Sequence, residues 1–305
     1  MKKDLLRMHD LTKEDVAGIL DLADQMKYDL RHGRAHRHLE GKTLGMIFEK
    51  ASTRTRVSFE TGMYQLGGQA LFLSANDLQI GRGEPVEDTA RVLSRYLDGI
   101  MIRTFAQREV EDLARHASIP VINGLTDLAH PCQVLADLMT VRERLSALSG
   151  VALCYIGDGN NMCNSLTVGA LTVGMSVSLA VPAGYDPAPE VLTFARTFGD
   201  RFRLLRDPRE AARGADVVAT DVWASMGQEA EAAARRQAFA GFQVNDDVMA
   251  LCAPHAIVLH CLPAHRGEEI TAAVFEAHAD SIFDEAENRL HAQKAVLSLL
   301  LSAKN

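Results

Sequence analysis

The chain alternates short apolar runs with longer stretches in which apolar residues recur every three or four positions. The first pattern is typical of buried strands and the second of helices packed on a sheet. Predicted strands of the first half lie at 43–48, 70–73, 99–102 and 120–122. Those of the second half lie at 151–156, 177–181, 202–205, 216–220 and 257–260. Strands that alternate with helices predict an α/β fold built on parallel sheets.

The pattern also predicts how the chain divides. A length of 305 residues exceeds one typical domain, so two domains of roughly 150 residues are expected. Predicted helices at about 13–30 and 134–145 belong to the first half. The two series of strands are separated at 146–150, and we place the domains at 1–148 and 149–288. A predicted helix at about 286–302 is too apolar for a free surface helix, so we expect residues 289–305 to return to the first domain.

Composition narrows the function classes. The net charge of −8 disfavours binding to nucleic acid, which relies on many basic contacts to phosphate. No apolar run approaches the roughly 20 residues of a membrane span, and the start lacks a secretory signal, so no membrane association and a cytoplasmic location are expected. Five cysteines, an odd count without a C-x-x-C pair, predict reduced thiols and no structural metal site.

A Ser-Thr-Arg-Thr-Arg segment at 52–56 places two guanidinium groups and three hydroxyls where a predicted strand passes into a helix. Ser52 occupies the position of an N-cap. Arginines in a first helical turn oppose the helix dipole, unless an anion compensates. The alternative is a solvated turn paired with Glu49 or Glu60. The hydroxyls favour a phosphate, which accepts from backbone N–H groups, hydroxyls and arginine.

Other polar residues follow predicted strands, where ligands of open parallel sheets bind. Arg103 follows 99–102, and His130, held extended by Pro131, precedes a helix. We interpret Arg103 as a second anion ligand or a salt bridge at the rim, and His130 as a donor to a carbonyl or oxyanion. In the second half, Asp221 follows 216–220 and suits a cationic amine. Cys261 follows 257–260 and is either buried packing or a site thiol.

The turn Gly157-Asp158-Gly159 resembles the opening of a dinucleotide-binding loop. However, the sixth position of that pattern is Met162, and no acid ends the next predicted strand to hold a ribose hydroxyl. A nicotinamide cofactor is therefore disfavoured. An oxidoreductase would also leave the segment at 52–56 unexplained.

Four segments together resemble the ornithine carbamoyltransferases, and the resemblance spans nearly the whole chain. The segment at 52–56 is shared by carbamoyltransferases in general, whereas the segments at 221–227 and 260–263 point to ornithine. The segments are Phe-Glu-Lys-Ala-Ser-Thr-Arg-Thr-Arg at 48–56, His-Pro-Cys-Gln at 130–133, Asp-Val-Trp-Ala-Ser-Met-Gly at 221–227 and His-Cys-Leu-Pro at 260–263.

The resemblance implies roles for individual residues. Carbamoyl phosphate would be bound by Ser52, Thr53, Arg54, Thr55, Arg56, Gln79, Arg103, His130, Gln133, Cys261, Leu262 and Arg289. Ornithine would be bound by Asn161, Asp221, Ser225 and Met226. Gln79 matches a position that reaches the site of a neighbouring subunit, which implies a homotrimer with shared sites. Of these residues, the catalytic ones would be Arg103, His130, Asp221 and Cys261.

The implied reaction joins carbamoyl phosphate and L-ornithine to give L-citrulline and phosphate, within arginine metabolism and in either direction. No metal or organic cofactor is required. Closure of the two domains is expected, because the reacting atoms must come within about 3 to 3.5 Å. Two alternatives stay open: a non-catalytic carbamoyl phosphate-binding protein, and putrescine as the acceptor. Aspartate fits less well, because its extra carboxylate calls for a cation where this chain has Asp221.

Overall fold

The structure is a computed structural model that describes residues 3–78, 83–224 and 229–302. The chain forms two compact units, Met1–Ala136 with Asn288–Asn305 and Asp137–Glu287. Among the described residues, no helix has the length and apolar character needed to cross a bilayer.

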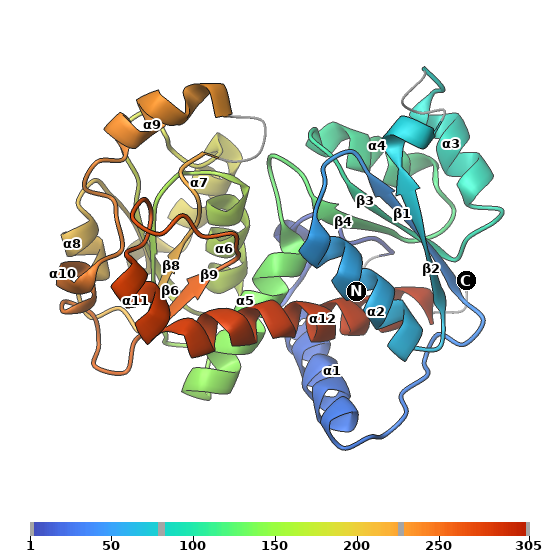
Figure 1. Ribbon diagram of the computed structural model, residues 1–305, viewed down its shortest axis with the longest axis horizontal. Helices are drawn as coiled ribbons and strands as arrows, with labels where there is room; N and C mark the ends of the chain where they lie inside the picture. The colour runs from blue at the N-terminus through green and yellow to red at the C-terminus, as the bar shows by residue number, and fades with distance from the viewer. Residues whose placement is uncertain (1–2, 79–82, 225–228, 303–305) are drawn as a thin grey trace. The chain divides into compact units, whose positions relative to one another are not determined.

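The first unit contains a four-stranded parallel sheet in the order β2-β1-β3-β4. Its strands are β1 (Thr43–Phe48), β2 (Gln69–Ser74), β3 (Gly99–Arg103) and β4 (Val121–Leu125). Its helices are α1 (Lys13–Arg31), α2 (Thr53–Gln65), α3 (Val86–Leu93) and α4 (Gln107–His116), with 3-10 turns η1 (Met8–Asp10) and η2 (Ala75–Asp77). Figure 1 shows α3 and α4 side by side, and their buried residues share a core with Ile47, Ile100 and Ile102 of the sheet.

The second unit contains a five-stranded parallel sheet in the order β7-β6-β5-β8-β9. Its strands are β5 (Ala152–Ile156), β6 (Ser176–Ala180), β7 (Phe202–Leu205), β8 (Val217–Thr220) and β9 (Ile257–His260). Its helices are α6 (Asn161–Thr172), α7 (Pro189–Arg196), α8 (Pro208–Ala212), α9 (Ala232–Ala238), α10 (Asp246–Met249) and α11 (Ala272–Ala277), with 3-10 turns η4 (Gly199–Arg201) and η5 (Glu229–Glu231). The strand order reverses beside β5, and such a switch point is where open sheets bind ligands.

Helices α5 (Pro131–Leu145) and α12 (Ala279–Leu301) each have residues in both units. The last part of α12 packs in the first unit, which confirms the predicted return of the C-terminal helix. There Lys27 of α1 donates to Asn288 at 2.6 Å, and Lys294 donates to Gln65 of α2 at 2.8 Å. Gly62 of α2 faces this helix, because a Cβ built on it would lie 3.3 Å from Cγ of Lys294.

The predicted α/β class with two parallel sheets is confirmed, but some element boundaries were wrong. The helix predicted from 286 begins at Ala279, because its first turns are mostly polar and hide the apolar period. One of those polar residues, Glu285, is buried and accepts the backbone N–H of His260 at 2.7 Å. Strand β4 extends beyond 122 because Asn123, although polar, is buried and donates to the carbonyl of Leu6 at 2.8 Å.

Candidate active site

The first cluster of site residues lies at the carboxyl edge of the four-stranded sheet. Phe48 and Arg103 are paired in register at the ends of β1 and β3, so the turn into α2 and the Arg103 side chain share one edge. Ser52 caps α2, and its hydroxyl accepts the N–H of Thr55 at 3.2 Å. The cap, and the N–H groups of a first turn that have no acceptor within the helix ladder, make this helix start suited to an anion.

Thr55 connects the helix start to α12. Its side chain is fully buried, and its hydroxyl oxygen accepts from Ser52 Oγ at 3.1 Å and from Nη2 of Arg289 at 2.9 Å. Arg289 is itself buried and lies within α12. The structure thus brings Arg289 to the segment at 52–55 from more than 200 positions away.

His130 is affected by the positive charge of three arginines in this unit. Pro131 begins α5, a position at which proline costs no hydrogen bond, and His130 immediately precedes it. Burial and then the charges of Arg289, Arg103 and Arg54 lower the pKa of the His130 imidazole well below its usual range. The ring is therefore neutral at pH 7 and can donate one N–H, while three guanidinium groups around it favour a multiply charged anion.

The other predicted ligands of this cluster differ in environment. Gln133 is fully buried in the first turn of α5. Arg56 instead donates to Glu60 at 3.0 Å, and its guanidinium carbon lies 3.9 Å from the centre of the Phe72 ring. Arg56 therefore makes one of the two ion pairs considered in the solvated-turn alternative. Gln79 lies outside the described residues.

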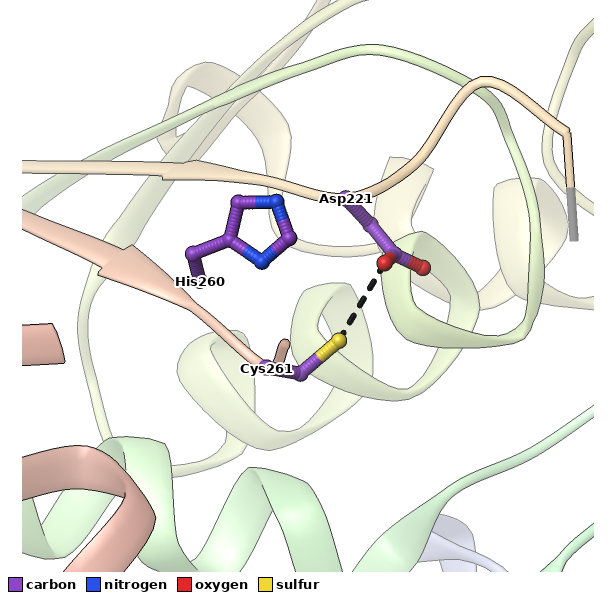
Figure 2. A group of neighbouring side chains, drawn as sticks. All are labelled: Asp221, His260 and Cys261. Carbon is purple, nitrogen blue, oxygen red and sulfur yellow. Dashed lines mark hydrogen bonds between the residues drawn. The ribbon is translucent and has the colours of Figure 1, made fainter. Parts of the chain in front are cut away.

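The second cluster lies at the carboxyl edge of the five-stranded sheet. Asp221 follows β8 and is buried. One of its carboxylate oxygens accepts from Nδ2 of Asn160 at 2.8 Å, and the other accepts from the backbone N–H of Val222 at 2.8 Å and from the Cys261 thiol at 3.2 Å. Figure 2 shows the bond between Cys261 and Asp221. These contacts fix a carboxylate at the switch point of the sheet.

The thiol of Cys261 is a hydrogen-bond donor in this cluster. Burial and then the negative charges of Asp221 and Glu285 raise the pKa of Cys261 well above its usual range. The thiol therefore stays protonated at neutral pH and points its hydrogen at Asp221. A protonated thiol is a poor nucleophile and a poor base.

The remaining predicted ornithine ligands lie around this edge. Asn161 is the first residue of α6, whose N-cap is Asn160. Ser225 and Met226 lie outside the described residues. Asn160 received no role from the sequence, although an asparagine before a helix is a strong N-cap signal. Its side chain accepts from the N–H groups of Met162 and Cys163, at 3.0 and 3.1 Å, while donating to Asp221.

Arg235 was also missed, because it comes from α9 and no local motif marks it. It is buried, donates to Asp158 at 2.6 Å and donates to the carbonyl of Trp223 at 2.9 Å. Through these two bonds Arg235 joins the turn after β5, which contains Asp158, to the turn after β8, which contains Trp223. A Cβ at Gly159 would lie 2.4 Å from the carbonyl oxygen of Tyr185. Glycine at this position therefore allows the backbone at Tyr185 to approach the turn closely.

Asp221, His260 and Cys261 lie close enough for their ligand atoms to be within 4.8 Å of one another. Their donor atoms already have protein partners, however. Nε2 of His260 contacts Glu269 at 3.0 Å and Nδ1 accepts from the N–H of Leu262 at 3.0 Å, while the protonated Cys261 donates to Asp221. The arrangement is that of a hydrogen-bonded network.

Known proteins resemble this chain over nearly its full length. The model described as aspartate/ornithine carbamoyltransferase, carbamoyl-P binding domain, matches residues 3–143, and the Asp/Orn binding domain model matches 149–300. Ornithine carbamoyltransferase of Syntrophotalea carbinolica is 56% identical over 302 residues, which cover 99% of this chain and 100% of that protein. The enzyme of Thermococcus kodakarensis is 53% identical over 98% of this chain and 96% of its own length.

Solved structures agree with these matches. The ornithine carbamoyltransferase of Pyrococcus furiosus superposes with a TM-score of 0.94 and 52% identity, over 99% of this chain and 98% of that one. An anabolic ornithine carbamoyltransferase of Campylobacter jejuni gives a TM-score of 0.92 at 43% identity, over 98% of this chain and 99% of that one. By both its sequence and its fold, this chain belongs to the ornithine carbamoyltransferases of the aspartate/ornithine carbamoyltransferase family.

Proposed function

We propose that this enzyme transfers the carbamoyl group of carbamoyl phosphate to the δ-amine of L-ornithine, giving L-citrulline and phosphate. One observation carries the proposal beyond the family match. The positive charges of Arg54, Arg103 and Arg289 act on the buried His130 and, together with its burial, keep its imidazole neutral. This much positive charge around a neutral donor suits a phosphate attached to a polar carbonyl.

In this proposal the first unit binds carbamoyl phosphate. The hydroxyls and N–H groups of the α2 start would hold the phosphate with the arginines, while His130 and Gln133 would contact the carbamoyl group. The family resemblance supports the full set, namely Ser52, Thr53, Arg54, Thr55, Arg56, Gln79, Arg103, His130, Gln133, Cys261, Leu262 and Arg289. Arg56 has the weakest support, because its guanidinium is committed to Glu60 and Phe72.

The second unit would bind ornithine. The Asp221 carboxylate, held by Asn160 and Val222, offers a fixed negative charge for an ammonium group. The resemblance assigns Asp221 and Ser225 to the α-amino group, and Asn161 with the Met226 N–H to the carboxylate. Putrescine lacks that carboxylate, so contacts from Asn161 and Met226 would favour ornithine.

The reaction begins when the δ-amine, as a neutral nucleophile, attacks the carbamoyl carbon. A tetrahedral oxyanion forms, which Arg103 and His130 would stabilise, and phosphate then leaves with the electrons of the broken C–O bond. The amine must lose one proton before attack and another after it. The first proton is lost to water. Since the Cys261 thiol is already protonated and donates to Asp221, we assign acceptance of the second proton to the carboxylate and its orientation to the thiol.

We also propose a homotrimer in which Gln79 of one subunit completes the site of its neighbour. The first unit carries apolar side chains that a monomer would leave in water: Val57 and Tyr64 on α2, and Leu71 and Phe72 on β2. Strand β2 is an edge strand of its sheet. Exposed apolar side chains next to an edge strand are typical of a protein–protein interface.

The acceptor is tested by supplying ornithine, putrescine, N-acetylornithine and aspartate separately with carbamoyl phosphate and detecting each product by mass. Ornithine should give the highest kcat/KM. A preference for putrescine would leave the phosphate site standing and remove the roles of Asn161 and Met226. Binding of carbamoyl phosphate without transfer to any amine would favour a non-catalytic binding protein.

A further inference from the structure

His260, the last residue of β9, has a fully buried side chain that takes no part in the reaction proposed above. Its two ring nitrogens face different partners. Nδ1 lies 3.0 Å from the backbone nitrogen of Leu262, and Nε2 lies 3.0 Å from Oε1 of Glu269. A backbone N–H can only donate, so Nδ1 is the acceptor and Nε2 carries the hydrogen that is donated to Glu269. The neighbours thus fix both the tautomer and the orientation of the ring.

Glu269 is equally well held. Its side chain is fully buried, and Oε1 also accepts the backbone N–H of His265 at 2.5 Å. Its own carbonyl accepts the N–H of Val244 at 2.8 Å, which ties this position to a different segment of the unit. Glu285, which is also buried, accepts the backbone N–H of His260 at 2.7 Å. Hydrogen bonds therefore fix both the backbone and the ring of His260.

The backbone shortly after His260 has an unfavourable conformation at Leu262. Leu262 has a φ of +57°, in the left-handed region that is unfavourable for a residue with a Cβ. The bond from its N–H to Nδ1 of His260 closes a tight turn that supports this conformation. Cys261 is the middle residue of the turn, and its thiol meets Asp221 at 3.2 Å. The direction of the thiol and of the Leu262 backbone therefore depends on the His260 ring.

We propose that His260, oriented by Glu269, is a positioning residue that holds Cys261 and Leu262 in the geometry used for carbamoyl transfer. The claim rests on the proposed function for the roles of Cys261 and Leu262. In this arrangement Glu269 fixes the imidazole, Nδ1 fixes the Leu262 N–H, and the turn then aims the thiol at Asp221. If the buried pair served only stability, its loss would lower activity only as far as it lowers the folded fraction.

Two substitutions distinguish a positioning role of His260 from a role in stability alone. In His260→Asn, the amide oxygen lies close to the place of Nδ1 and can still accept from Leu262, but the contact with Glu269 is lost. In His260→Gln, the amide nitrogen reaches toward the place of Nε2 and can still donate to Glu269, but the acceptor for Leu262 is lost. We expect kcat/KM for ornithine to fall by about 100-fold in His260→Gln and by less than about 10-fold in His260→Asn, at similar melting temperatures.

A second measurement, the alkylation rate of Cys261, does not depend on catalysis. The alkylation rate of Cys261 by iodoacetamide at pH 9, followed by peptide mass spectrometry, reports how the thiol is held. We expect a changed rate in His260→Gln and a rate near that of the wild type in His260→Asn. Equal rates in the two variants, or activity losses that follow the melting temperature alone, would overturn the proposal.

A second pair of variants keeps the test decisive if His260→Gln does not fold. Glu269→Gln retains an acceptor for Nε2 of His260 and should leave the alkylation rate nearly unchanged, whereas Glu269→Met should change it. Equal rates in this pair would also overturn the proposal. Failure of the proposed role of Cys261 is recognised separately: Cys261→Ala would then transfer carbamoyl to ornithine at the wild-type rate, while the alkylation comparison would still decide the role of His260.

Discussion

Among single residues, Thr55 combines buried hydrogen bonds with a proposed role in binding carbamoyl phosphate. Its oxygen is buried and accepts from Ser52 and Arg289. Thr55→Val keeps the shape and leaves the Arg289 donor without this acceptor. We expect the free energy of unfolding to fall by about 1 to 3 kcal/mol, and KM for carbamoyl phosphate to rise at least about 10-fold. Denaturant titration and initial rates measure the two effects, and Thr61→Val on the same helix, expected to change stability by less than about 0.5 kcal/mol, is the control.

The pH profile tests the assignment of the proton acceptor. Because the pKa of Cys261 is raised well above its usual range, the thiol stays largely protonated between pH 7 and 9. The rise of kcat/KM above pH 7 should therefore follow the ornithine amine, whose unperturbed pKa is about 10.4, and should persist in Cys261→Ser at a lower rate. A profile that became flat in Cys261→Ser would show that the thiol itself titrates.

At the scale of elements, the last half of α12 carries a buried ammonium group. Nζ of Lys294 lies 2.8 Å from Oε1 of Gln65 and 3.0 Å from Nε2 of His36, and burial lowers the pKa of Lys294 to about 8. Between pH 8 and the unfolded pKa near 10.4, the unfolded chain binds a proton that the folded chain has released, so stability should rise with pH in this window.

Lys294→Met removes this contribution, because its side chain does not titrate. Effects of pH common to both proteins cancel in the difference between their melting temperatures. We therefore expect the melting temperature of the wild type to gain on that of Lys294→Met as the pH rises from 8 to 10. A difference that is constant across this range would show that Lys294 keeps its charge in the folded protein.

Helices and strands could be predicted from the sequence where the apolar residues within the element itself define its ends. Strands β1, β7 and β9 have the predicted bounds, because each is an apolar run between polar turns. The start of α12 was not predictable, since Glu285 is buried for a partner, His260, that is 25 residues away. The same limit applies to the site. Ser52 and Asp221 are marked by their places at strand ends, whereas Arg235 and Glu269 acquire their roles only through tertiary contacts.

At the scale of the whole molecule, the exposed apolar side chains of the first unit test the proposed assembly. Tyr64 is 81% exposed in the single chain. A double substitution, Tyr64→Glu with Leu71→Lys, places charge among these side chains, so we expect a trimer to dissociate and activity to fall. Light scattering after size-exclusion chromatography measures the mass. A wild-type protein with the mass of one chain would contradict the trimer, and Tyr96→Glu, on another exposed aromatic side chain, is the control.

In the proposed reaction the two units bind different substrates: the arginines that act on His130 bind carbamoyl phosphate, and Asp221 binds ornithine. Calorimetric titration of carbamoyl phosphate into the wild type, Arg54→Gln and Asp221→Asn tests it most directly, since binding is measured without turnover. We expect Arg54→Gln to weaken carbamoyl phosphate binding by at least about 100-fold, and Asp221→Asn to bind it within about threefold of the wild type while transferring almost none to ornithine. Wild-type affinity in Arg54→Gln, or an equal loss in both variants, would show that the two substrates are not divided between the units in this way.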